Sequence, residues 1–569
     1  MFRRTAAVAF LFVFALTSVA AAVEHPAELF TPDVSLVIRL KNPEATTKKV
    51  AEFAEAINPG FGPMVTARAE GLGVVISNPE RAGVDPAQDW WVGVYASGES
   101  RPVLVYVVPA KDMQAMQDAV KETIGANFLA HESWGIYSED AQAVEKVRAR
   151  IDGKEKALVD DVDQALRETF ERGDLSVFIN VSQLAKVYDA SIADAQDQLR
   201  ATAENAPPGA EAMLGMYLEL SKPLFQSLDD ATGAVVTLTV DKKAAALEAL
   251  GKVKEGSETA KLLDSTPSEN KLLTRLPADG QAYYAMSKIP AALQEWSLNI
   301  MQATVQATDG DEEALDEIKD VMRRMQKLDM GGSAGMIAIT AEGAEKGLRT
   351  ASVMDVAQPQ QMRLLTKELI AAQADLSFGG VKSNYQLTQH AETFGKYKAD
   401  TLKVEQEFEQ NPFIDVQQIY DVLFGEEGVL TRMVFTDKQV VQTLGGGKEA
   451  MSKFLKRVEQ SEPPALSTEL QITRDGLPQQ ANLIGMLDLP GALSRAIRLF
   501  LNSGLIPIAV DPEAISIRET NSYFGISLGT EPQGVRVKVF VPVEQAKNSY
   551  RFGMEVFQVM QDMRQQQIQ

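Results

Sequence analysis

One short segment has the residue types and spacing of a serine hydrolase. Gly331–Gly335 matches G-x-S-x-G with Ser333 in the nucleophile position, and Asp355 or Asp375, then His390, follow in hydrolase order. In hydrolases this motif forms a sharp turn between a strand and a following helix, which exposes the serine. Here a charged helical pattern precedes the glycines and an apolar strand pattern follows them. We therefore interpret them as a flexible helix-to-strand connection, and a hydrolase using Ser333 is the least favoured function.

A second glycine-rich segment, Gly445-x-Gly447-x-x-Ala450, lies between a predicted strand and a predicted helix. A dinucleotide site with this spacing needs a parallel β-α-β unit, whereas the residues before it resemble a hairpin. A phosphate loop needs Gly and Ser or Thr at the positions of Gln442 and Glu449. We interpret the segment as a helix-entry turn that uses the conformational freedom of glycine, and we expect no cofactor.

Side chains that bind transition metals are scarce. The sequence contains three His, at positions 25, 131 and 390, and no Cys. No two His stand three or four residues apart, the spacing that brings two ligands to one helix face. The lack of Cys excludes disulfides, thiolate nucleophiles and Cys-ligated metals. No calcium-type ligand loop is present either, so we predict no metal site and no catalytic residues.

Composition and the first residues predict an exported, soluble protein. The 569 residues are 45% hydrophobic and carry a net charge of −22, which disfavours nucleic acid as a partner. Residues 1–22 have the form of a signal peptide, with Arg3 and Arg4 before an apolar run and Ala20–Ala22 as the cleavage site. A large exported chain without Cys favours the bacterial envelope. We expect a periplasmic, or else extracellular, protein with no membrane-spanning segment in the mature chain.

A pattern of strand, helix, hairpin and helix recurs along the chain. In the first copy, the apolar run 36–40 precedes Asn42 and Pro43, which are typical of a helix start. The spacing between strand and proline in 36–43 recurs at 483–490 and at 283–290. We predict four such β-α-β-β-α units, near 35–124, 175–263, 282–371 and 482–564.

These units divide the chain into two pseudo-equivalent halves, 23–270 and 271–569, and the second half contains an enlarged insert, 372–480. The residues 535–539 alternate valine with Arg536 and Lys538. A period of two indicates antiparallel strands with one buried and one wet face. We predict an α+β fold of internally duplicated units, whose antiparallel sheets carry helices on one face while the other face is at least partly open.

The residues identify no convincing catalytic constellation, so we predict a non-enzymatic scaffold or binding protein. Its partner would be another envelope component, bound on an open sheet face or in the cleft between the halves. The alternative is a periplasmic carrier or chaperone for lipid or other apolar cargo, which the apolar strands and Met-bearing helices favour. A continuous apolar groove would support the carrier, and a polar cleft of converging titratable groups would support an enzyme.

Overall fold

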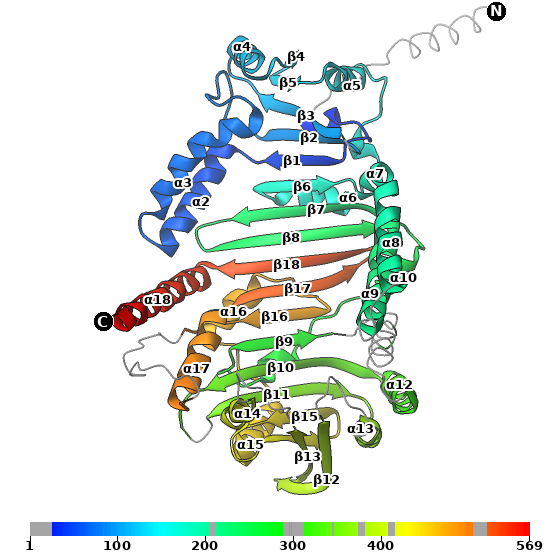
Figure 1. The fold of residues 1–569 in the computed structure, drawn as a ribbon, viewed down its shortest axis with the longest axis vertical. Helices are drawn as coiled ribbons and strands as arrows, with labels where there is room; N and C mark the ends of the chain where they lie inside the picture. Colours follow the sequence, from blue (N-terminus) through cyan, green and yellow to red (C-terminus); the bar gives the residue numbers. More distant parts are fainter. Residues whose placement is uncertain are drawn as a thin grey trace, which may run out of the picture.

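The computed structural model contains a single large sheet (Figure 1). It describes residues 25–98, 100–204, 211–287, 295, 298, 312–343, 346–373, 382–407, 416–504 and 520–568. The predicted signal peptide, 1–22, lies outside these residues, as do Pro290 and Asp375. Within the described ranges 18 strands pair into one sheet. The prediction of several sheets is therefore wrong, because a strand of the first half of the chain pairs with a strand of the second half at the centre of the sheet.

The strands alternate with helices in the predicted order. The strands of residues 25–270 are β1 (Leu36–Leu40), β2 (Trp90–Ser97), β3 (Ser100–Pro109), β4 (Asn127–His131), β5 (Trp134–Ser138), β6 (Leu175–Ile179), β7 (Ala231–Val240) and β8 (Ala244–Val253). Those of residues 271–568 are β9 (Ala282–Met286), β10 (Met330–Thr340), β11 (Gly347–Val356), β12 (Lys382–Phe394), β13 (Tyr397–Glu407), β14 (Val429–Phe435), β15 (Gln439–Leu444), β16 (Leu483–Leu487), β17 (Phe524–Glu531) and β18 (Gly534–Pro542).

All pairings between these strands are antiparallel, and their order can be followed from edge to edge. The first eight strands run β4-β5-β3-β2-β1-β6-β7-β8. From the other edge, after the added pair β12-β13, the order is β14-β15-β11-β10-β9-β16-β17-β18. The strands β8 and β18 then pair at the centre. Both parts of the sheet thus follow one order of pairing.

The registers agree as well as the order. In one part β1 pairs over its full length with β6, so that Leu36 faces Ile179. In the other part β9 pairs in the same way with β16, so that Ala282 faces Leu487. Each of these four strands also pairs with the strand that follows its helical segment, namely β2, β7, β10 and β17.

Helices occupy both sides of the sheet. They are α2 (Pro43–Ile57), α3 (Phe61–Ala69), α4 (Met113–Ile124), α5 (Ala141–Ile151), α6 (Gln164–Arg172), α7 (Val181–Val187), α8 (Asp189–Glu204), α9 (Glu211–Asp230), α10 (Glu258–Leu262), α12 (Glu312–Gln326), α13 (Pro359–Gln373), α14 (Val416–Phe424), α15 (Gly447–Val458), α16 (Thr468–Asp475), α17 (Leu489–Asn502) and α18 (Val543–Ile568). Short 3-10 turns are η1 (Pro26–Leu29), η2 (Glu70–Ile76), η3 (Leu158–Asp160) and η4 (Leu272–Arg275).

The helix after the first strand of a unit starts with a side-chain cap in three of the four units. Asn42 accepts a hydrogen bond from the backbone of α2, Asn180 from that of α7 and Asp488 from that of α17. These caps satisfy backbone N–H groups that have no partner within the helix. The predicted helix start at Asn42 is confirmed, and α2 ends before Asn58 as expected.

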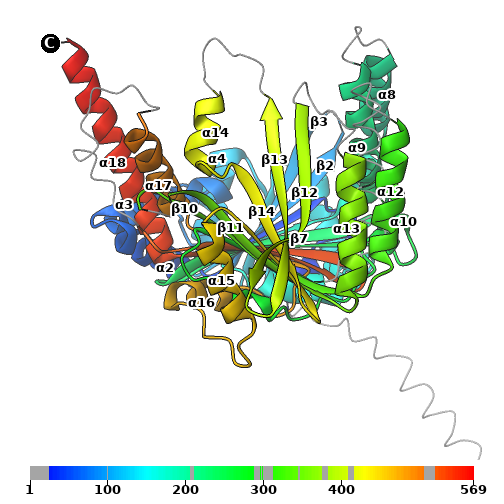
Figure 2. The ribbon, with the colours of Figure 1, turned by 90° about the horizontal axis from the view of Figure 1, so that it is seen from below.

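One face of the central sheet, here called the covered face, packs against helices and forms two buried cores. In the first, strand residues such as Phe178 and Val235 contact side chains of α5 and α6, among them Leu166. In the second, residues such as Ile484 pack with α15 and α16, including Phe454. Figure 2 shows α15 and α16 beneath the sheet, on the side opposite to α17, α18 and α8.

Candidate functional site: an open apolar sheet face

The opposite face of the eight central strands, here called the open face, is the main candidate site. Cross-strand pairs define it, since directly opposed residues point to the same side of a sheet. At the centre, Leu247 of β8 faces Val539 of β18, and Ala249 faces Val537. The open face comprises Leu36, Ile38, Leu40, Leu175, Val177, Ile179, Ala234, Val236, Leu238, Ala245, Leu247, Ala249, Gly251, Val535, Val537, Val539, Val541, Phe524, Ile526, Leu528, Leu483, Gly485, Leu487, Ala282, Tyr284 and Met286.

Apart from the hydroxyl of Tyr284, every residue named above is apolar and partly or fully exposed. Two further residues on this side of the sheet, Val240 opposite Ala245 and Thr530 opposite Val535, are buried. Burial raises the pKa of Tyr284, so its hydroxyl stays neutral. Leu247 is 46% exposed and Ile526 41% exposed, whereas Leu250, on the covered face of the same strand as Leu247, is 0% exposed. Large contiguous apolar patches of this kind mark interaction sites or ligand grooves in soluble proteins.

Helices bound the open face on all sides without covering its centre. Beyond β1, residues of β2 and β3 on this side are buried by η2 and α4, as with Val92 against Met116. Beyond β10, α12 and α13 cover the corresponding side, as with Val440 near Leu365. Along the strand ends, α2, α3, α17 and α18 rise on one margin and α8 and α9 on the other (Figure 2). The open face is thus the floor of a trough.

Two rows of directly opposed side chains run along this floor, across all eight strands. The first row is Ile38, Val177, Val236, Ala249, Val537, Leu528, Leu483 and Met286, and the second is Leu40, Leu175, Leu238, Leu247, Val539, Ile526, Gly485 and Tyr284. With neighbouring strands about 4.8 Å apart, each row is about 34 Å long. The margins add further exposed apolar side chains, such as Leu493 of α17 and Phe557 of α18.

The charges of the central strands lie on the covered face. There Arg536 of β18 forms ion pairs with Glu248 of β8 and with Glu531. Burial lowers the pKa of Arg536, but the two carboxylates outweigh it and raise the pKa, which keeps the guanidinium charged. The alternation at 535–539 is therefore confirmed as a strand, but the apolar side of that strand is the uncovered one. An alternating pattern shows two faces without showing which face the helices cover.

The serine motif lies within a strand instead of a connection. Ser333 is in β10, opposite Met286 on one side and Met354 on the other, which corrects the interpretation of residues 331–335 as a helix-to-strand connection. Asp355 accepts a hydrogen bond from Gln439, and His390 donates its backbone N–H to Asp400. A regular strand lacks the turn that exposes a nucleophilic serine.

The glycine-rich segment forms a helix-entry turn, as predicted. The strands β14 and β15 form an antiparallel hairpin, and Gly445, Gly446 and Gly447 all adopt positive φ before and at the start of α15. A Cβ atom on Gly445 would collide with the backbone oxygen of Leu348. The glycines are explained by this geometry, because L-residues with side chains rarely adopt positive φ.

Two of the three His lie in strands, since His131 ends β4 and His390 lies in β12. Among the described residues, no group of three or more His, Cys, Asp or Glu could hold a metal ion. No described helix combines the length and the apolar character that crossing a membrane requires.

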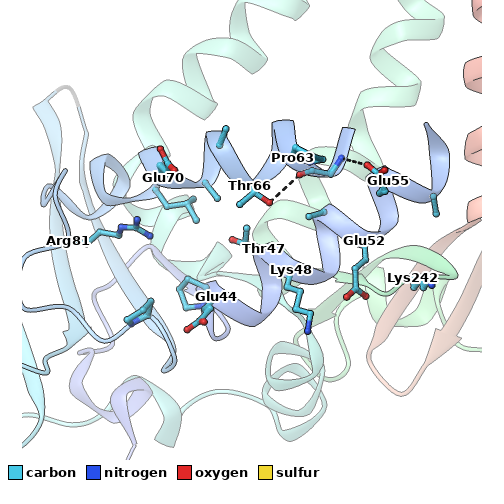
Figure 3. Close-up of a pocket in the computed structure, with 18 residues that line it drawn as sticks. Glu44, Thr47, Lys48, Glu52, Glu55, Pro63, Thr66, Glu70, Arg81 and Lys242 are labelled. Atoms are coloured by element: carbon cyan, nitrogen blue, oxygen red, sulfur yellow. Dashed lines mark hydrogen bonds between the residues drawn. The ribbon is translucent and has the colours of Figure 1, made fainter. Parts of the chain in front are cut away.

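A pocket with a volume of about 1220 Å³ lies on the surface formed by α2 and α3 (Figure 3). Carboxylates and cations both line it, among them Glu52, Glu55 and Lys48. Glu55 accepts hydrogen bonds from the backbone N–H groups of Gly60 and Gly62, so it stabilises the connection between the two helices. These two hydrogen bonds explain the position of Glu55 without a ligand.

Asp488 is a buried carboxyl that could serve as an acid, but its bonds assign it a structural role. Its Oδ1 accepts hydrogen bonds from the backbone of Gly491 and from the hydroxyl of Thr520. Burial raises the pKa of Asp488 above its ordinary value. It caps α17, as Asn42 and Asn180 cap the corresponding helices.

Comparison of the chain with protein-family models, with curated proteins and with solved structures finds no match. The site is therefore judged on its geometry alone. Sequence reasoning anticipated an open sheet face but named none of its residues. The sequence does contain a signal for these residues, because each strand contributes an alternating apolar run. It does not show on which face of the sheet the helices pack.

Proposed function

We propose that this chain is a non-enzymatic binding protein of the bacterial envelope, exported and soluble, which holds an apolar partner on the open face. The observation that carries the proposal is the uninterrupted apolar floor across eight strands. Leaving so much apolar surface in water opposes folding by roughly 25 cal/mol per Å² relative to covering it. A surface retained at that cost is accounted for by a partner that covers it.

The arrangement favours binding over catalysis. The open face offers no charged group, and its hydroxyls are those of Tyr284 and of Thr530, which is buried and hydrogen-bonded to Ser265 and Asn482. Acid–base or nucleophilic chemistry needs at least two polar groups that converge on a reacting atom. Ser333 stands at the margin of the floor, within β10 and directly after a register shift, and the strand continues after it where a nucleophile turn would need a helix. The hydrolase hypothesis therefore gains no support from its surroundings.

We further propose that the chain arose by internal duplication, with halves 23–270 and 271–569. The support is the shared strand order and the matching registers of β1 with β6 and of β9 with β16. Unrelated segments have no reason to agree in both order and register. The hairpin β12–β13, which has no counterpart in the first half, lies within the insert 372–480.

Export is proposed from the first residues, whose Arg3, Arg4 and apolar run have the form of a signal peptide. An oxidising compartment would be harmless to this chain, since it has no Cys. N-terminal sequencing of the protein from the periplasmic fraction of a bacterial host tests the proposal. We expect a mature chain that begins at Val23, and an intact Met1 in the cytoplasmic fraction would contradict it.

Binding on the open face is tested with a solvatochromic apolar dye titrated into the purified protein. We expect saturable binding that Leu247→Asp weakens at least tenfold, because a carboxylate would have to be desolvated beneath the dye. The matched control is Thr239→Asp, since Thr239 is exposed on β7 beside the same hairpin but points to the other side. Absence of saturable binding, or equal loss in both variants, would refute the proposal.

A further inference from the structure

We infer that the open face binds the acyl chains of single lipid molecules and selects them by chain length, with the headgroup contributing little. This inference rests on the proposed function, because it names the ligand of the same surface. Its basis is the match between the hydrogen-bonding capacity, the shape and the dimensions of the trough and those of hydrocarbon chains.

Hydrogen bonding is the first criterion. The backbones of the eight strands are paired with their neighbours in the sheet, and the two rows of side chains offer one hydroxyl, that of Tyr284. An extended peptide lying on this floor would leave its own N–H and C=O groups without partners, which costs free energy for each group. An acyl chain has no such groups and incurs no such cost.

Shape is the second criterion. A second sheet stacked on the floor would have to approach to about 10 Å over its whole width. The helices along both margins, α2, α17 and α18 on one side and α8 and α9 on the other, stand in that approach (Figure 2). The same helices keep a flat bilayer surface from reaching the floor. Slender chains enter such a trough, which favours individual lipid molecules over a second copy or a membrane.

Length is the third criterion. The hydrocarbon core of a bilayer is about 30 Å thick, so one acyl chain spans about 15 Å. The two rows of side chains, each about 34 Å long, thus accommodate two chains end to end or several lying side by side along the strands. Both rows cross the central pair Ala249–Val537 and Leu247–Val539 without interruption.

Selection by chain length follows from the composition of the floor. Each buried methylene group contributes about 0.8 kcal/mol, so two more methylenes are expected to strengthen binding roughly 15-fold. A headgroup outside the floor meets no charged residue of the open face. Changing it at constant chain length is therefore expected to alter affinity less than about threefold, far below the effect of two methylenes.

The test is displacement of the apolar dye by lipids at monomeric concentrations. One series varies chain length in fatty alcohols of 12, 14 and 16 carbons, in steps expected to differ roughly tenfold or more. A second series keeps the chain and exchanges the alcohol for a monoacylglycerol or a lysophosphatidylcholine. Leu247→Asp should weaken all of them alike, and Thr239→Asp none of them.

The outcomes separate this inference from the proposed function. If the dye binds but affinity follows the headgroup, or if only an amphipathic peptide displaces the dye, the inference is overturned and the proposed function stands. Flotation of the protein with phosphatidylcholine vesicles would also overturn it, since the floor would then be reached by a bilayer. If the dye itself fails to bind, the proposed function falls first.

Discussion

Two leucines on one strand provide a direct measure of whether the open face is uncovered in the folded protein. Leu250 and Leu247 both belong to β8 but point to opposite faces of the sheet. Leu250 is 0% exposed and belongs to the core that also contains Val235 and Phe178. Leu247 is 46% exposed. The same substitution, Leu→Ala, therefore removes the same atoms from two different environments.

The expected free energies differ because only one substitution creates a cavity. Leu250→Ala loses the transfer free energy of its buried carbons and leaves a void in a packed core, so we expect a loss of about 3 kcal/mol, within the usual 2–5 kcal/mol. Leu247→Ala loses about half of the transfer term and leaves no void, since solvent occupies the space. At about 0.8 kcal/mol per carbon, its cost is about 1 kcal/mol.

Urea unfolding followed by circular dichroism measures both costs in free energy of unfolding. We expect the loss for Leu250→Ala to exceed that for Leu247→Ala at least twofold. Dye binding should show the opposite order, with Leu247→Ala the weaker binder. Equal losses of stability would mean that Leu247 is packed in the folded protein, and the open face would then be no binding surface.

Three further substitutions test individual structural assignments. Burial raises the pKa of Asp488 above 3.8, so its ionised form is disfavoured in the folded state and the wild type should lose stability as pH rises above about 4. Asp488→Asn should remove this loss, and unfolding measured from pH 4 to 8 tests it. Gly445→Ala should cost about 2 kcal/mol and lower the melting temperature, since alanine would need positive φ and would collide with Leu348. Arg432→Ala should cost about 3 kcal/mol in urea unfolding, because it removes a buried guanidinium and leaves the half-buried carboxylate of Glu392 with the exposed Lys448 as its cation.

Much of the fold was predictable from local patterns. Two helix starts follow from a capping side chain just before the helix. Asn42 caps α2, and Ser257 caps the short helix α10. The hairpin before α15 was also predicted, since it is a local element. Local signals predict local elements well because the contacts that form them lie within a few residues.

What sequence reasoning missed depends on contacts between distant residues. Joining the two parts into one sheet requires β8 to pair with β18, across about half of the chain. The glycines on both sides of Ser333 were interpreted as a flexible connection. Glycine also occurs in strands, however, at positions where another residue approaches the backbone closely. Gly335 is such a case, because a Cβ atom there would collide with the ring of Tyr284. Neither fact has a local signature.

An open sheet face was predicted, but its residues were not identified, for the same reason. A sheet normally turns its apolar residues toward the covering helices and its charges toward water. In β18 the arrangement is reversed, since Arg536 lies on the covered face, where Glu248 and Glu531 compensate its charge, and the valines face the trough. Folding alone gains nothing from this reversal, because compensated charges on the covered face stabilise less than apolar packing would. The proposed hydrocarbon ligand would account for the reversal, because it would complete the burial of the valines.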